Sequence, residues 1–174
     1  MPEDIGAVLK SRIRDIPDYP QPGILFKDIT PLLSDGEAFA AAVVALAAGH
    51  DGVTKVAGIE ARGFILAAPV ALELHAGFVP VRKMGKLPAD TYAESYDLEY
   101  GTATIEVHTD AFDAADRVLI VDDVLATGGT AAATASLIRQ AGATVVGVTV
   151  LLELEFLDGR AKLPGTPVRS LLPV

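Results

Sequence analysis

Cysteine is absent from this chain of 174 residues, and histidine occurs only three times. The absence of cysteine excludes disulfide bonds, thiolate metal sites and a cysteine nucleophile, and it is compatible with the reducing cytoplasm, where we expect the protein to work. The histidines, His50, His75 and His108, are scattered, and neither H-E-x-x-H nor G-x-S-x-G occurs. We interpret all three as structural or exposed, and we expect neither a zinc site nor a hydrolytic triad.

Long apolar runs and an excess of basic charge are missing too. The longest apolar segment, Ala38 to Gly49, is far shorter than the roughly 20 residues of a membrane-spanning helix. The acidic N-terminus, Met1 to Asp4, has no signal-peptide pattern. A net charge of −9 argues against a general nucleic-acid surface. We expect no membrane and no nucleic acid among the partners, whereas a phosphorylated small molecule needs only a local cluster of cations.

The remaining composition fits one folded domain. Hydrophobic residues make up 51% and charged residues 21% of a chain that is long enough to bury a sizeable core. Helix-like and strand-like segments alternate, which predicts a single α/β domain over residues 1–174 with a mainly parallel central sheet flanked by helices. We expect helices at about 3–14, 37–48, 63–75 and 131–140, and strands at 55–59, 78–82, 117–121, 144–152 and 168–172.

Two segments interrupt this alternation. Residues 1–33 join the N-terminal helix to an extended hood broken by prolines, with an apolar patch at 24–26 and a turn at 27–31. Residues 82–107 contain a loop that we expect to be mobile, because few apolar residues anchor it, and then a hairpin or flap around Tyr100-Gly101. Phe26 in the hood fits two interpretations about equally, packing in the core or stacking on a flat base.

The most informative segment is V-L-I-V-D-D-V-L-A-T-G-G-T, from Val118 to Thr130. Its first four residues predict a buried parallel strand, and we expect Asp122 and Asp123 directly after its end. Glycines let a backbone approach an anion closely, and the free N–H groups of a helix start favour negative charge, so Ala126–Thr130 predicts a phosphate cradle. The carboxylates suit sugar hydroxyls, so the ordered set favours a sugar phosphate over a simple turn. The lysine of a P-loop and a G-x-G-x-x-G motif are both missing.

Two further loops follow predicted strands. Ligands of open α/β sheets lie at the carboxyl ends of the strands, so we expect Glu60–Gly63, Arg82–Lys86 and Asp122–Thr130 to meet at one site. Arg62 presents a fork that suits phosphate oxygens, although alone it would be typical of a surface turn. The basic loop with Arg82, Lys83 and Lys86 predicts a lid over a polyanion, and its alternative is a solvated surface.

The segment Asp122–Thr130 resembles the phosphoribosyl pyrophosphate signature of the type I phosphoribosyltransferase family. Other segments occur in the family's order over nearly the whole chain and narrow the resemblance to its adenine-specific branch. The block P-G-I-L-F and the sequence L-E-Y-G are the ones that point to adenine. The matching segments are 16–20, 22–31, 60–64, 81–88, 95–101 and 159–163.

This resemblance implies a purine-salvage enzyme, a pentosyl transferase that makes AMP and pyrophosphate from adenine and 5-phosphoribosyl 1-pyrophosphate (PRPP). It also implies a homodimer and Mg²⁺ as cofactor, held mainly by PRPP and water rather than directly by the protein. The 5′-phosphate and ribose would contact Asp122, Asp123, Ala126, Thr127, Gly128, Gly129 and Thr130. The pyrophosphate would contact Glu60, Ala61, Arg62, Arg82, Lys83 and Lys86, with a cis Glu60-Ala61 peptide and with Arg82 a candidate to reach a neighbouring subunit.

The same resemblance assigns the base and the chemistry. Adenine would contact Leu25, Phe26, Lys27, Ala126 and Leu154, partly through backbone groups. Lys27 departs from the arginine common in the family, so a guanidinium contact is lost unless the backbone makes the contact. The implied catalytic residues are Glu99, Tyr100 and Arg62, with Glu99 assisting proton removal from the base and Tyr100 positioning the flap or the leaving group.

Three rivals to this interpretation remain. A hypoxanthine/guanine or xanthine enzyme of the same fold would need polar contacts at the purine 6-position, for which no block is apparent. A non-catalytic sensor of PRPP or nucleotides often carries a DNA-binding domain, and none accompanies this acidic chain. An interaction module that merely retains the fold would bind no PRPP at all. The enzyme for adenine is therefore our expectation.

Overall fold

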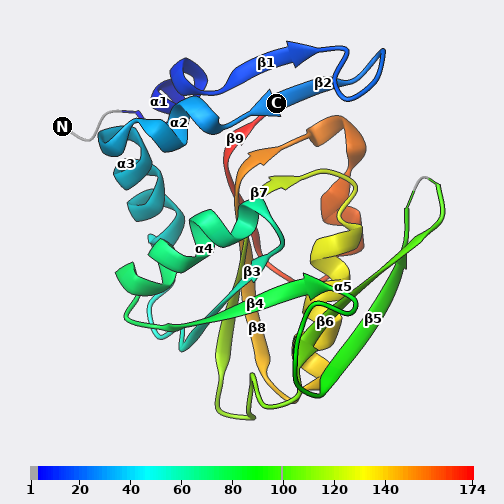
Figure 1. Cartoon of the computed structure of the whole chain (residues 1–174). Helices are drawn as coiled ribbons and strands as arrows, with labels where there is room; N and C mark the ends of the chain where they lie inside the picture. The colour runs from blue at the N-terminus through cyan, green and yellow to red at the C-terminus, as the bar shows by residue number, and fades with distance from the viewer. Residues whose placement is uncertain (1–3, 99) are drawn as a thin grey trace.

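A sheet of seven strands forms the centre of the molecule, in the spatial order β5-β6-β4-β3-β7-β8-β9 (Figure 1). The computed structural model describes residues 4–98 and 100–174. Strands β3, β4, β7, β8 and β9 run parallel, and β6 pairs antiparallel with β4 and β5, which confirms the mainly parallel α/β fold. The strands are β3 (Lys55–Ile59), β4 (Gly77–Lys83), β5 (Thr91–Asp97), β6 (Thr102–His108), β7 (Arg117–Leu125), β8 (Thr144–Glu153) and β9 (Val168–Pro173).

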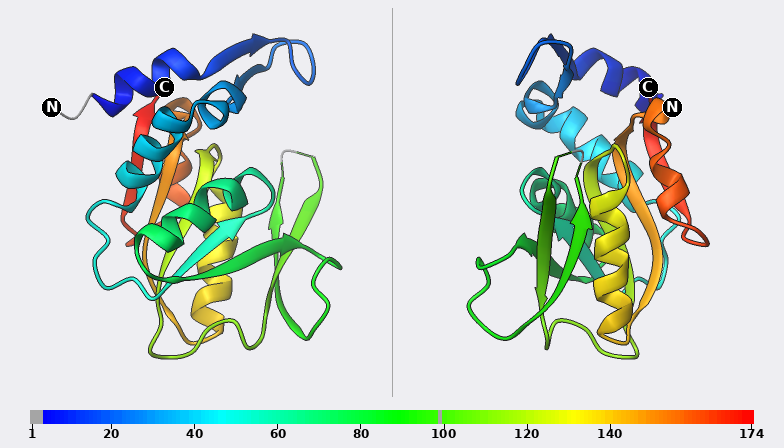
Figure 2. Two further views of the ribbon diagram at one scale, coloured as in Figure 1. Left: turned by 60° about the vertical axis from the view of Figure 1, so that its left-hand side comes forward. Right: turned by 90° about the vertical axis from the view of Figure 1, so that its right-hand side faces the viewer.

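Helices cover both faces of this sheet (Figure 2). Alternation along β7 gives the reason, because Leu119 and Val121 belong to one apolar core while Val118 and Ile120 belong to the other. All four side chains are fully buried, as expected for a strand covered on both faces. The first core contains side chains of α1 (Ile5–Arg12), α2 (Thr30–Ser34), α3 (Gly36–Ala47) and α4 (Arg62–Glu73), and the second contains those of α5 (Gly129–Gln140).

The N-terminal hood is a separate antiparallel pair, β1 (Arg14–Pro17) and β2 (Leu25–Asp28), beyond the carboxyl ends of the central strands (Figure 2). The predicted N-terminal helix is confirmed as α1, but it is shorter than the expected span of about 3–14 and ends at Arg12, because Arg14 already pairs with Asp28 in the hood. A second prediction for this region was wrong. The turn expected at 27–31 is the end of β2 followed by α2, where Pro31 occupies the first turn and its missing N–H removes no helical hydrogen bond.

The strand of the sugar-phosphate motif is longer than predicted. β7 continues to Leu125, so Asp122 and Asp123 lie within the strand and not after it. The parallel partner β8 extends the ladder, with Asp122 opposite Val150 and Val124 opposite Leu152. Helix α5 begins at Gly129, two residues before the predicted start at 131. The hairpin predicted after the basic loop is confirmed by the β5–β6 pair.

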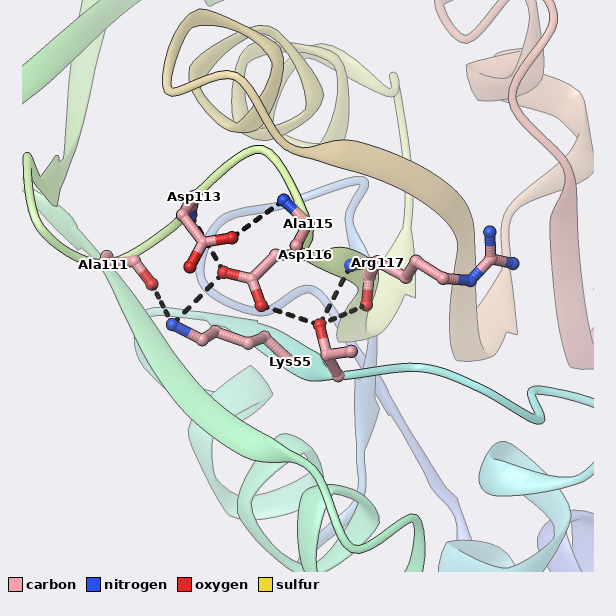
Figure 3. Close-up of polar contacts among 7 residues, drawn as sticks. Lys55, Ala111, Asp113, Ala115, Asp116 and Arg117 are labelled. Atoms are coloured by element: carbon pink, nitrogen blue, oxygen red, sulfur yellow. Dashed lines mark hydrogen bonds and ion pairs between the residues drawn. The ribbon is translucent and has the colours of Figure 1, made fainter.

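A polar network closes the opposite, amino end of the sheet (Figure 3). The buried carboxylate of Asp116 accepts hydrogen bonds from the Thr54 hydroxyl at 2.8 Å and from the Asp113 N–H at 2.9 Å. Lys55 Nζ lies 3.3 Å from Asp116 Oδ2 and donates to the Ala111 carbonyl oxygen. Burial raises the pKa of Asp116, but these hydrogen bonds and the lysine outweigh it and lower the pKa overall. The network fixes the connection between β6 and β7 to the start of β3.

Candidate active site

A cavity of about 430 Å³ lies between the hood and the carboxyl ends of β3, β4 and β7. All five residues expected to hold adenine line it, and so does Arg62, while Tyr96 of β5 lies on its wall. The structure thus brings together strand ends and a hood that are far apart in the sequence. The lining includes Leu25, Phe26, Lys27, Glu60, Ala61, Arg62, Lys83, Tyr96, Asp122, Asp123, Ala126, Thr130 and Leu154.

The predicted phosphate cradle is a second, smaller hollow of about 80 Å³ lined by residues 124–131, Asp122 and Val150. Gly128 is in the left-handed region with a φ of 82°, and it precedes the first turn of α5 without a side-chain cap. The first N–H groups of the helix therefore remain available to an anion. A Cβ atom on Gly128 would also collide with the Gly159 carbonyl oxygen, so both the positive φ and the lack of space require glycine at this position.

The sequence analysis assigned no site role to the residues behind the cradle. Gly159 opens the short helix η2 (Gly159–Lys162) and packs directly on the Ala126 carbonyl oxygen, where no side chain fits. Arg160 binds the carboxylate of Glu153 through two hydrogen bonds of 2.6 and 2.7 Å. These bonds outweigh burial, which opposes the ionised form, and they lower the pKa of Glu153. The resembling segment 159–163 marked this region, although only the fold shows what it supports.

The two aspartates of β7 differ in their surroundings. Asp123 is 4% exposed, and its Oδ2 lies 2.7 Å from Arg62 Nε, an ion pair without hydrogen-bond alignment. Burial and the charge of Asp123 raise the pKa of Asp122 well above its ordinary range. Asp122 Oδ1 accepts a 2.9 Å bond from the Asp123 N–H, and a Cβ on Gly63 would lie 2.9 Å from the same oxygen. Gly63 therefore allows α4 to approach the carboxylates.

Arg62 also contacts the hood. Its Cζ atom lies 5.1 Å from the centre of the Phe26 ring, which packs edge-on against Tyr19. Phe26 lines the cavity and is only partly buried, which favours base stacking over simple core packing. Lys27 directs its Nζ to Asp15 at 2.7 Å, so its side chain is bound within the hood.

The predicted basic loop gathers on Glu60. Its carboxylate lies 2.7 Å from Lys86 Nζ and 3.3 Å from Arg82 Nη2, and it accepts a 2.8 Å bond from the Lys83 N–H. Burial opposes the ionised form, yet these partners lower the pKa of Glu60 to about 2. The Glu60-Ala61 peptide is cis, as the resemblance implied. Arg82, the candidate to reach a neighbouring subunit, contacts Glu60 of its own chain.

The flap supplies the remaining predicted residues. Tyr100 is 87% exposed and is not part of the cavity wall, while Glu99 lies outside the described residues. Within residues 4–98 and 100–174, no group of three or more His, Cys, Asp or Glu side chains is placed to hold a metal ion. In the same part of the chain, no helix has the length and apolar character needed to cross a membrane.

Comparison with known proteins agrees with this geometry. The model of the phosphoribosyl transferase domain family matches residues 32–164. An adenine phosphoribosyltransferase of Acidothermus cellulolyticus is 65% identical over 99% of both chains. The crystal structure of the Rhodothermus marinus adenine phosphoribosyltransferase superimposes with a TM-score of 0.93 at 55% identity, covering 98% of both chains. The Saccharomyces cerevisiae enzyme, solved with adenine and an imino-altritol bisphosphate, superimposes with a TM-score of 0.91 at 37% identity, covering 97% of this chain and 98% of that one.

A mainly parallel sheet with the motif loop at its carboxyl edge, together with the family match over residues 32–164, defines the class as the phosphoribosyl transferases. The chain belongs to the phosphoribosyl transferase family, and within it to the adenine phosphoribosyltransferases. It is a pentosyl transferase, and its reaction forms AMP and pyrophosphate from adenine and PRPP.

Proposed function

We propose that this reaction takes place in the 430 Å³ cavity and its adjoining phosphate hollow, with Mg²⁺ accompanying PRPP. The observation that carries the proposal is the continuity of three subsites. The hood lies on one side of the cavity and the β7–α5 loop on the other. The cations around Glu60 lie at the carboxyl ends of β3 and β4. A base, a ribose phosphate and a pyrophosphate thus each have a chemically matched place along one wall.

Adenine binds beneath the hood. Phe26 offers an aromatic face, and Leu25, Ala126 and Leu154 provide apolar walls, which suit a flat purine. Because the Lys27 side chain is held by Asp15, the backbone of β2 is the part that hydrogen-bonds the edge of the base. This arrangement explains why lysine at position 27 is compatible with the function.

The ribose phosphate lies along β7 and the start of α5. Residues 126–130 bind the 5′-phosphate through backbone N–H groups and the hydroxyls of Thr127 and Thr130. Asp122 and Asp123 accept hydrogen bonds from the ribose hydroxyls. Arg62, next to Asp123, is close to both the sugar and the leaving group, so it holds PRPP in position for attack.

Pyrophosphate departs toward the basic loop. The bond between the anomeric carbon and oxygen breaks with its electron pair on pyrophosphate, and the ring nitrogen of adenine forms the new bond to that carbon. Arg62, Arg82, Lys83 and Lys86 neutralise the leaving group, and Arg82 and Lys86 exchange Glu60 for pyrophosphate. Glu99 remains our candidate to take the proton from the base, and Tyr100 to position the flap.

The residues present fit a magnesium ion. The wall of the cavity carries the carboxylates of Asp122 and Asp123, and oxygen is the ligand atom that Mg²⁺ prefers. Mg²⁺ usually keeps several waters and takes its other oxygens from substrate phosphates, so these carboxylates would hold its water molecules. The ion would lend positive charge to the departing pyrophosphate.

We also propose a homodimer in the cytoplasm. Ile65 and Leu72, two turns apart on α4, are 44% and 76% exposed, and Phe78 of the adjacent β4 is 38% exposed. An apolar group of this kind is typical of a surface that another protein covers. Leu72→Glu should turn a dimer into a monomer in light scattering, with Val44→Glu on α3 as the control. Cell fractionation tests the location.

Titration of PRPP into the protein, with and without Mg²⁺, tests the location of the site. Gly128→Ala should abolish binding, because the new Cβ collides with Gly159. Gly49→Ala is the matched control, since Gly49 also has a positive φ but no described atom within 4 Å of the added Cβ. Equal PRPP binding by both variants would show that the phosphate site is not at residues 126–130. PRPP binding by the wild type without any AMP formation would favour the sensor.

A further inference from the structure

Tyr96 joins the flap to the phosphate loop. Its hydroxyl oxygen accepts a 2.9 Å hydrogen bond from Thr130 Oγ1, and its ring lies against the start of α5. A Cβ built on Gly129 would be 3.1 Å from Tyr96 Cδ2, so a side chain at position 129 would require the ring to shift by a few tenths of an ångström. Neither the sequence of the phosphate loop nor that of the flap predicts this contact, because it joins two segments that are far apart in the chain.

The position of Tyr96 is fixed from its own strand. Glu94, two residues earlier on β5, accepts a 3.1 Å hydrogen bond from Ser136 Oγ of α5. Because side chains two apart in a strand share a face, Glu94 and Tyr96 both face the helix. The Tyr96 side chain is partly buried and lines both the main cavity and the groove beside α5.

We propose that Tyr96 is a positioning residue for the 5′-phosphate, acting through the hydroxyl of Thr130. The inference rests on the proposed function of residues 126–130 as the 5′-phosphate site. A Thr hydroxyl has one proton, and phosphate oxygens in their ionised form only accept hydrogen bonds. Thr130 must therefore turn its proton from Tyr96 to the phosphate when PRPP or AMP binds.

Tyr96 allows this exchange without the loss of a hydrogen bond. Once Thr130 donates to the phosphate, the phenol O–H of Tyr96 rotates and donates to Thr130 Oγ1. The two hydroxyls then form a chain in which each bond polarises the next. A phenylalanine would keep the ring against Gly129 but would leave the Thr130 oxygen without its donor. The effect falls on ligands that carry a 5′-phosphate and spares adenine and pyrophosphate.

Equilibrium binding of AMP and adenine to Tyr96→Phe tests the proposal. One hydrogen bond contributes about 0.5–1.5 kcal/mol, so AMP affinity and the KM for PRPP should change by about two- to tenfold. The affinity for adenine and the KM for pyrophosphate in the reverse reaction should stay at wild-type values. Tyr92→Phe is the matched control, because Tyr92 is on the same strand and its hydroxyl has no hydrogen bond to a described residue.

A double-mutant cycle separates coupling from a general structural effect. Thr130→Ala should weaken AMP binding by itself, and adding Tyr96→Phe should cause no further loss. Additive losses of AMP affinity in the double mutant would overturn the proposal. So would a Tyr96→Phe variant that binds AMP as tightly as Tyr92→Phe does, or one in which the affinities for AMP and for adenine fall equally. Partial unfolding lowers the number of binding sites and leaves the ratio of the two affinities unchanged. A wild-type protein that binds no AMP would remove the proposed phosphate site itself, whereas normal wild-type binding with an unaffected Tyr96→Phe rejects only the role of Tyr96.

Discussion

Arg62 Nε lies 2.7 Å from Oδ2 of the buried carboxylate of Asp123. This pair joins the start of α4 to the sugar side of the cavity, while the Phe26 ring lies on the guanidinium from the base side. One side chain thus contacts two of the proposed subsites, that of the sugar and that of the base. Its replacement is the most informative single change in the proposed pyrophosphate subsite.

Arg62→Lys should lower kcat/KM for PRPP by about ten- to a hundredfold. Lysine keeps the charge but loses the planar fork, and a hydrogen bond to a charged group contributes about 1.5–3 kcal/mol. Steady-state kinetics with Arg117→Lys as the control would measure the loss. An unchanged kcat/KM would mean that Arg62 serves only as a counterion to Asp123.

Gly159→Ala should weaken PRPP binding although residue 159 contacts no proposed substrate position, because its Cβ would displace the Ala126 carbonyl oxygen behind the cradle. Overpacking of this kind destabilises by about 1–3 kcal/mol. Gly36→Ala is a fitting control, since Gly36 is at the start of α3 with no described atom within 4 Å of the added Cβ. We would measure the PRPP dissociation constant by calorimetry, and equal constants for the two variants would contradict the buttressing role.

Lys27→Met should change the KM for adenine by no more than about twofold, because the Lys27 side chain binds Asp15 and we propose that the backbone of β2 contacts the base. Phe26→Ala should raise that KM by about tenfold, since stacking of a base on an aromatic ring contributes about 1–3 kcal/mol. Initial rates over a range of adenine concentrations measure both. A large effect of Lys27→Met would show a direct contact between its side chain and adenine.

The pKa of Glu60, about 2 against an ordinary 4.5, predicts a pH dependence of stability. The unfolded chain takes up the proton more readily, so this stabilisation is complete above about pH 4.5 and is lost as the pH falls toward 2. It amounts to at most about 3 kcal/mol. Urea unfolding between pH 6 and pH 3 should show a flatter dependence for Glu60→Gln than for the wild type. Glu73→Gln, on the exposed side of α4, should keep the wild-type slope, and parallel slopes for both variants would refute the assignment.

Asp116→Ala should destabilise the fold while leaving kcat per folded molecule unchanged. The change removes the carboxylate that binds Thr54 and Lys55 at the amino end of the sheet (Figure 3), and none of these residues lines the cavity. A hydrogen bond to a charged group contributes about 1.5–3 kcal/mol, which is the expected size of the loss. Thermal unfolding and active-site titration would be compared with Asp110→Ala, an exposed neighbour. A fall in the kcat of the folded fraction would contradict the view that this network at the amino end of the sheet affects stability and not catalysis.

The sequence predicted the fold where local pattern and packing agree. The buried run Val118–Val121 identified the central strand, and Gly128 identified the loop, because both signals come from residues that are adjacent in the chain. The end of β7 was misplaced because Asp122 and Asp123 are polar, and a polar pair normally ends an apolar run. Only the partner strand β8 shows that the ladder continues past them.

Contacts between distant segments could not be predicted. Nothing in the local sequence places Tyr96 on Thr130, or Gly159 behind Ala126, since each contact depends on how the sheet and α5 pack. The cations of the basic loop were recognised by type, but Glu60 was not recognised as the common partner of Arg82 and Lys86. A carboxylate that binds cations from a loop more than twenty residues away has no signal in a single sequence.

The most direct test of the account is one assay with four bases. Purified protein would be mixed with PRPP, Mg²⁺ and adenine, hypoxanthine, guanine or xanthine in turn, and the nucleotide and pyrophosphate formed would be measured. We predict AMP and pyrophosphate in equal amounts from adenine, and no comparable product from the three 6-oxopurines. Turnover of a 6-oxopurine in preference to adenine, or no product from any base, would contradict the central claim.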